Sequence, residues 1–96
     1  DIKHENTIAE NYELKQNYPN PFNPVTTIRF SLPKNEFVSI KVYDITGREA
    51  AVLVNSQLNA GTHAVSFDAR NFASGIYFYK MISGNYSEIR KMMLVK

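Results

Sequence analysis

The stretch that decides the fold is TIRFSLPKNEFVSIKVYDITG, residues 27–47. Apolar and polar side chains alternate in it twice, over residues 27–32 and again over residues 38–43. A period of two places alternate side chains on one face of a strand, so each run predicts a β-strand with one buried face. The Pro-Lys-Asn segment at 33–35 ends the first strand, and we expect the two strands to be antiparallel neighbours.

Turn signals divide the rest of the chain into similar short strands. Asp44 opens a turn with an Asx-type side chain, and Gly47 can take a positive φ near its end. No window of 11 residues keeps the roughly 3.6-residue apolar period of a helix, and further strands are expected at 48–54, 63–68, 76–81 and 86–96. About seven strands with frequent turns predict an all-β, immunoglobulin-like antiparallel sandwich.

The inward positions of these strands define the predicted core. Its members are Ile28, Phe30, Ile40, Val42, Val65, Phe67, Tyr77 and Tyr79. Tyr77 follows Ser74 and Gly75 at the start of a strand, the tyrosine-corner position of immunoglobulin-like folds, where its hydroxyl is expected to bond nearby backbone.

Prolines set the segment 17–24, NYPNPFNP, apart from the strands. Proline has no backbone donor and fixes φ near about −65°, so this segment cannot be a central strand. We expect an edge segment or a lid, with Tyr18 and Phe22 anchoring it over one open end of the sandwich.

Composition bounds the class of protein. The chain has 96 residues, 44% of them hydrophobic and 21% charged, which is typical of one globular domain. Absence of cysteine excludes a disulfide framework, and a net charge of +2 gives no support to nucleic-acid binding. No apolar run approaches the roughly 20 residues that cross a bilayer. Residues 1–11 are interpreted as the remnant of a linker from a larger protein, and residues 12–96 as the domain.

Candidate catalytic groups are few. The imidazoles are His4, in the predicted linker, and His63, where a backbone hydrogen bond at the rim of the core is expected. The carboxylates form no motif for glycoside hydrolysis or calcium, and the four scattered glycines form no phosphate loop. Asp44 and Asp68 are expected to cap turns. We predict a non-catalytic domain with no cofactor, metal or small-molecule substrate.

Motifs along nearly the whole domain resemble type IX secretion C-terminal sorting domains. The first are LKQNYPNPFNPVTTI at 14–28 and VYDITGR at 42–48. AGTH at 60–63, ASGIYFY at 73–79 and KMMLVK at 91–96 follow in the family order. The specificity lies in the combination of the proline cassette, the two glycine turns and the terminal lysine.

The resemblance implies a function and partners. Family members are similar to the immunoglobulin-like domain of the flagellar hook-cap protein and lie at the C-termini of proteins secreted by Bacteroidetes. Such a domain directs the N-terminal cargo domain of the same precursor through the type IX translocon and sorting machinery. The cargo passes from the periplasm across the outer membrane to the cell surface, and the domain is usually cleaved.

A label that accompanies many cargoes is expected to carry its information on an exposed edge or terminal strand, which a partner can pair with or select by charge. The residues expected to serve recognition are Lys91, Lys96, Gly75, Gly47, Arg48, Asn20, Pro21 and Phe22. Two other functions stay open: a structural or adhesion spacer, and a carbohydrate-binding module of a glycoside hydrolase, which needs a planar row of exposed aromatic side chains.

Overall fold

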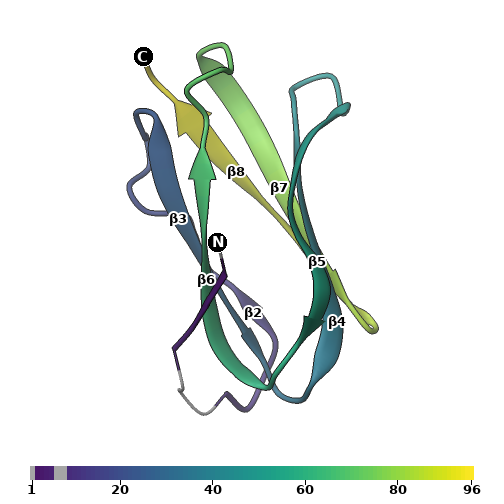
Figure 1. Cartoon of the computed structure of the whole chain (residues 1–96). Coiled ribbons are helices and arrows are strands. Elements are labelled where there is room, and N and C mark those ends of the chain that lie inside the picture. Colours follow the sequence, from purple (N-terminus) through teal and green to yellow (C-terminus); the bar gives the residue numbers. More distant parts are fainter. Residues whose placement is uncertain (1, 6–8) are drawn as a thin grey trace.

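The structure, a computed structural model, describes residues 2–5 and 9–96. Within these ranges it contains eight strands and no helix, and therefore no helix that is long and apolar enough to cross a membrane (Figure 1). The strands are β1 (Ile2–His4), β2 (Glu13–Leu14), β3 (Val25–Leu32), β4 (Glu36–Tyr43), β5 (Glu49–Leu58), β6 (Gly61–Asp68), β7 (Gly75–Ser83) and β8 (Tyr86–Leu94).

The strands form two antiparallel sheets that pack face to face (Figure 1). The strand order is β1-β6-β3-β2 in the first sheet and β5-β4-β7-β8 in the second. The predicted all-β, immunoglobulin-like sandwich is confirmed, with four strands in each sheet.

The strand β1 lies in the segment 1–11 and has no counterpart among the predicted strands. It pairs with β6 between Ile2 and Val65 and between His4 and His63. The interpretation of residues 1–11 as a linker remnant stays a prediction, and residues 1 and 6–8 of that segment lie outside the described ranges.

The strands β3 and β4 are not neighbours, so that prediction is wrong. β3 pairs with β2 and β6, whereas β4 pairs with β5 and β7. The connection at 33–35 crosses from one sheet to the other, and both strands contribute side chains to one core from opposite sheets. Alternation specifies which face of a strand is buried but does not specify its hydrogen-bonding partner.

The predicted core is confirmed, because all eight of its members are buried. The same cluster includes residues from outside the predicted strands, among them Leu14 and Phe22. The Tyr77 hydroxyl donates a 2.7 Å hydrogen bond to the Ala73 carbonyl, as expected at a tyrosine corner.

The edge strand β5 is longer than predicted and continues to Leu58. Its pairing with β4 shifts register between Ile40 and Lys41 and again between Val42 and Tyr43. Such irregularities bend a strand and hinder edge-to-edge pairing.

The candidate recognition site

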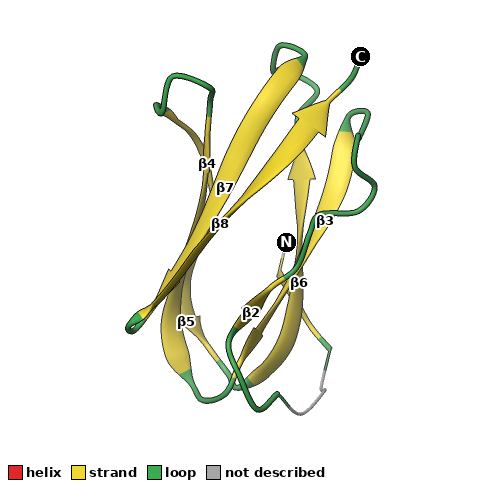
Figure 2. Cartoon of the chain, turned by 180° about the vertical axis from the view of Figure 1, so that it is seen from behind, coloured by secondary structure: helices red, strands yellow, loops and turns green. Residues whose placement is uncertain are grey.

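The segment 15–24, here called the strap, joins β2 to β3 and follows the open side between the two sheets (Figure 2). Its first half is bound to β3 through the backbone. The Lys15 N–H donates to the Arg29 carbonyl at 2.9 Å, and Tyr18 and Thr27 exchange hydrogen bonds of 2.9 and 3.0 Å. The strap is therefore an edge segment, as its prolines indicated.

The second half of the strap is bound to the last strand of the other sheet. The Phe22 N–H donates to the Met93 carbonyl, and the Val95 N–H donates to the Phe22 carbonyl, both at 2.9 Å. The Asn20 Oδ1 accepts the Met93 N–H at 3.0 Å. The strap thus connects the edge of β3 with the edge of β8 and closes this side of the sandwich.

The side chain of Phe22 anchors the strap in the core. It is 2% exposed, and its ring centroid lies 6.0 Å from that of Phe67. Tyr18 was expected to share this role, but its side chain is 77% exposed and only its backbone holds the strap. The prediction is correct for Phe22 and wrong for Tyr18, because the backbone pairing with Thr27 leaves the Tyr18 ring on the solvent side.

A buried hydroxyl fixes the start of the strap. The Tyr79 Oη donates to the Lys15 carbonyl at 2.7 Å and accepts the Asn17 N–H at 2.8 Å. The Asn17 side chain in turn donates to the Pro19 carbonyl and to Thr26 Oγ1. Burial raises the pKa of Tyr79 to about 12, so the hydroxyl is protonated at neutral pH. Sequence reasoning placed Tyr79 in the core without this role, although a buried tyrosine hydroxyl usually has a partner.

The C-terminus and the β6–β7 loop complete this end of the molecule (Figure 1). The exposed Lys96 donates from Nζ to the Arg70 carbonyl at 2.6 Å. Gly75 begins β7 opposite Leu94 and has a φ of 148°. A Cβ on Gly75 would meet no atom within 4 Å, so this position favours glycine for its backbone conformation alone.

Gly47 and Arg48 lie in the β4–β5 turn, at the same end but beyond the other edge of the second sheet (Figure 1). The Asp44 carboxylate accepts the backbone N–H groups of Thr46 and Arg48 at 2.9 and 3.1 Å, and Gly47 has a φ of 88°. The hydrogen bond from the Thr46 hydroxyl, together with these backbone bonds, lowers the pKa of Asp44. The predicted Asx-type turn is confirmed.

The structure therefore divides the expected recognition residues into two groups. Asn20, Pro21, Phe22, Gly75 and Lys96 lie together where the strap meets β8, and we call this region the strap end. Of the other three, Gly47 and Arg48 lie in the β4–β5 turn and Lys91 lies on the outer face of the second sheet, opposite Phe78. The strap also contributes Gln16, whose Nε2 donates to the Lys91 carbonyl at 2.7 Å and which sequence reasoning missed.

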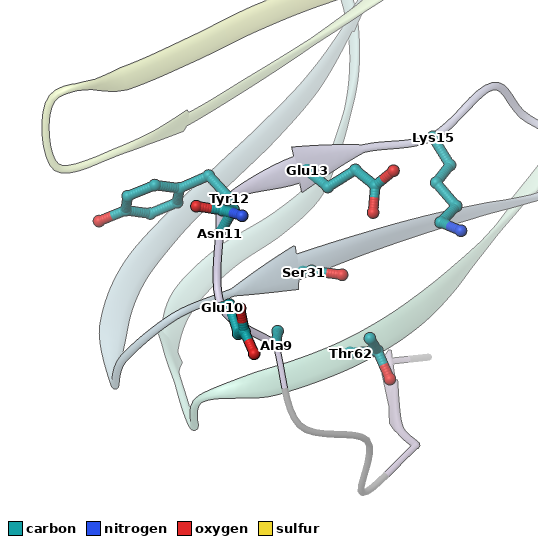
Figure 3. A pocket seen from close by; sticks show the side chains of 8 residues that line it. All are labelled: Ala9, Glu10, Asn11, Tyr12, Glu13, Lys15, Ser31 and Thr62. Carbon is teal, nitrogen blue, oxygen red and sulfur yellow. The ribbon is translucent and has the colours of Figure 1, made fainter.

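The remaining pockets and polar groups are weaker candidates for a functional site. A polar pocket is formed at the opposite end by Ala9, Glu10, Asn11, Tyr12, Glu13, Lys15, Ser31 and Thr62 (Figure 3). His63 makes the expected backbone contact, 2.7 Å from Nε2 to the Asn59 carbonyl. Its ring is 2% exposed and stacks on the core residue Phe30 and on the exposed His4. Over residues 2–5 and 9–96, no three His, Asp or Glu side chains gather where they could hold a metal ion.

Comparison with known proteins identifies the family. A family model described as "Secretion system C-terminal sorting domain" matches residues 16–96, from within the strap to the final residue. The chain belongs to this family. The matched range includes all eight residues that were expected to serve recognition. Searches among curated proteins and among solved structures gave no match.

Family membership makes the chain a C-terminal sorting domain of type IX secretion. Such a domain marks a protein for export through the outer membrane, to the cell surface or the medium. It interacts with the secretion machinery and accompanies an N-terminal cargo. The family consists of non-catalytic domains.

Proposed function

We propose that the type IX machinery recognises this sorting domain in its folded state, at the strap end. The observation that carries the proposal is the occupation of the β8 edge by the strap. The outward backbone groups of Met93 and Val95 are bonded to Asn20 and Phe22. A partner meets a surface built jointly from the two most distinctive motifs, the proline cassette and the terminal strand.

Pairing of a partner strand with this part of β8 is disfavoured. It would require breaking three hydrogen bonds, at about 1 kcal/mol each, between the strap and β8. It would also expose the Phe22 ring, which costs about 2–3 kcal/mol. The sum of roughly 5–6 kcal/mol approaches the whole stability of a small domain. Recognition therefore uses side chains and the strap surface rather than strand addition at this edge.

Lys96 is the residue of the strap end that presents a free charge. Its ammonium contacts one backbone carbonyl, that of Arg70, and its side chain is exposed. An exposed charge of this kind contributes little to stability but can select an acidic partner.

The test separates folding from delivery. A reporter is fused upstream of residues 1–96 and expressed in a host with type IX secretion, and surface delivery is compared for Lys96→Gln and the matched loop variant Lys34→Gln. We expect Lys96→Gln to reduce delivery by at least about tenfold while the melting temperatures of both domains stay within about 2 °C of the parent. Normal delivery by Lys96→Gln, and by a variant lacking residues 95–96, would refute recognition at the strap end.

The proposal includes catalytic silence of this chain. The support is the small set of candidate groups, since His63 is buried and the Asp44 carboxylate is engaged by its own turn. Turnover of an ester, peptide or glycoside substrate by the purified domain, abolished by a point substitution within it, would contradict this part.

A further inference from the structure

The outer face of the second sheet carries alternating rows of large apolar and cationic side chains. Strand register places Tyr43, Phe78 and Lys91 side by side across β4, β7 and β8. The next row, by the same register, consists of Lys41, Lys80 and Ile89. The four side chains on β4 and β7 point away from the core, because their neighbours along each strand include buried core residues. Ile89 and Lys91 lie on the same face, because they are directly opposite Lys80 and Phe78.

Several apolar side chains on this face are exposed to solvent. Ile89 is 57% exposed, and Ile45, in the β4–β5 turn, is 72% exposed. These two residues line a shallow groove together with Tyr43, Phe78, Lys80, Asp44 and Gly47. By register, the row beyond Phe78 and Lys91 places Ile76 opposite the exposed Met93. Clustered exposure of this kind on a small domain marks an interaction surface.

The charges of this face are unbalanced. Lys41 lies 3.3 Å from Glu49, whereas Lys80 and Lys91 take part in no ion pair within the described ranges. Lys41 and Lys80 are moreover directly opposite one another in the β4–β7 ladder. Like charges at directly opposite positions destabilise a sheet, so the fold itself gains nothing from this pair.

We propose that this face, comprising Lys41, Tyr43, Phe78, Lys80, Ile89 and Lys91, binds an acidic surface of a protein of the secretion machinery. The complementary surface presents at least two carboxylates beside an apolar side chain that enters the groove. A carboxylate between Lys41 and Lys80 relieves their repulsion, and burial of Ile89 and Phe78 supplies the apolar contact. The proposal rests on the sorting function and adds a second contact region to the strap end.

Two other occupants fit the face less well. A second copy of the chain would bring its own lysines against these, which opposes a symmetric contact. A lipid surface would require side chains to enter the interface by about 5–10 Å, but Phe78 and Tyr43 are half-buried. Four strands about 4.8 Å apart and eight residues long at ~3.3 Å each give roughly 500 Å², the size of a transient protein contact.

Two matched pairs of variants test the proposal in the full precursor. Lys80→Glu and Ile89→Ser alter the face, while Lys34→Glu in the β3–β4 loop and Val25→Ser on the first sheet make comparable changes elsewhere. Val25 is 42% exposed, which makes it a suitable partner for Ile89. We expect Lys80→Glu and Ile89→Ser to reduce surface delivery by at least about tenfold, and the controls to change it by less than twofold. The melting temperature should not fall in Lys80→Glu, because a repulsive pair is removed.

Photo-crosslinking identifies the occupant. A photoreactive phenylalanine analogue at position 89 should yield an adduct with one protein of the secretion machinery, and Lys80→Glu should abolish that adduct. Restoration of the adduct and of delivery by an Asp or Glu→Lys change in that protein at the crosslinked surface would support the charge contact directly. An adduct with a second copy of the chain, or Lys80-dependent binding of the purified domain to phosphatidylglycerol vesicles without any protein adduct, would overturn the proposal.

Unchanged delivery in both face variants also overturns it. Failure of this inference is distinguishable from failure of the proposed function. If Lys96→Gln impairs delivery and the face variants do not, recognition at the strap end is supported and binding at the outer face is refuted. If the face variants impair delivery and changes at the strap end do not, the opposite holds.

Discussion

Removal of one hydroxyl should loosen the strap and destabilise the whole domain. Tyr79→Phe keeps the buried ring but deletes the donor to the Lys15 carbonyl and the acceptor of the Asn17 N–H. Asn17 is only 2% exposed, so its N–H is left without a partner in a buried position. Two hydrogen bonds at about 0.5–1.5 kcal/mol each, with the cost of an unsatisfied group, give an expected loss of about 1.5–3 kcal/mol.

The expected change is large enough for routine measurement. In a domain of this size, 1 kcal/mol corresponds to about 4–8 °C in melting temperature, so Tyr79→Phe should lower Tm by about 6–24 °C. Hydrogen exchange should show faster exchange of the Asn17 amide. Tyr18→Phe is the matched control within the strap, because the Tyr18 side chain is 77% exposed. Its stability should change by less than about 0.5 kcal/mol.

The pH dependence of the stability difference between the parent and Tyr79→Phe provides an independent check. The folded-state pKa of Tyr79, about 12, lies above the ordinary value of 10.0. Its contribution is therefore complete below pH 10 and is lost as the pH rises from 10 to 12, by roughly 3 kcal/mol in total. The stability difference between the parent and Tyr79→Phe should shrink over this window. A constant difference, or a Tm within 2 °C of the parent at pH 7, would show that the hydroxyl does not hold the strap.

Three further predictions concern stability alone. Phe67→Ala should cost about 3–5 kcal/mol in chemical denaturation because Phe67 is in the core, and a loss below 1 kcal/mol would contradict that placement. Gly75→Ala should cost about 1–3 kcal/mol through its φ of 148° alone, and an unchanged denaturation midpoint would refute the strain argument. Lowering the pH below 4 should destabilise the parent more than Asp44→Asn, because the pKa of Asp44 is lowered in the folded state and its contribution is lost on protonation. Equal acid sensitivity in thermal melts of the two proteins would mean that the turn does not depend on the Asp44 charge.

Much of the local structure at the proposed recognition site follows from local sequence. The Asx-type turn at Asp44 and Gly47 depends on residues within five positions of one another, so their side chains predict it directly. The prolines likewise predict that the strap is not a central strand, whatever lies beside it. Phe22 was expected, together with Tyr18, to anchor the strap, and the sequence did not distinguish the ring that is buried from the one that is exposed. These local rules do not predict which other segment of the chain each one pairs with.

The sequence by itself determined the class of fold and the eight predicted members of the core, because a period of two fixes which side chains of a strand are buried. Only the tertiary structure decided which strands are neighbours, since strand pairing depends on contacts between residues distant in the chain. It separated β3 from β4 and placed the strap on β8 through Phe22 and Met93, 71 residues apart by their numbers. It also aligned Lys41 with Lys80 on one face. Both surfaces proposed for recognition arise from such distant pairings. The alternation of apolar and polar residues along the chain does not specify them.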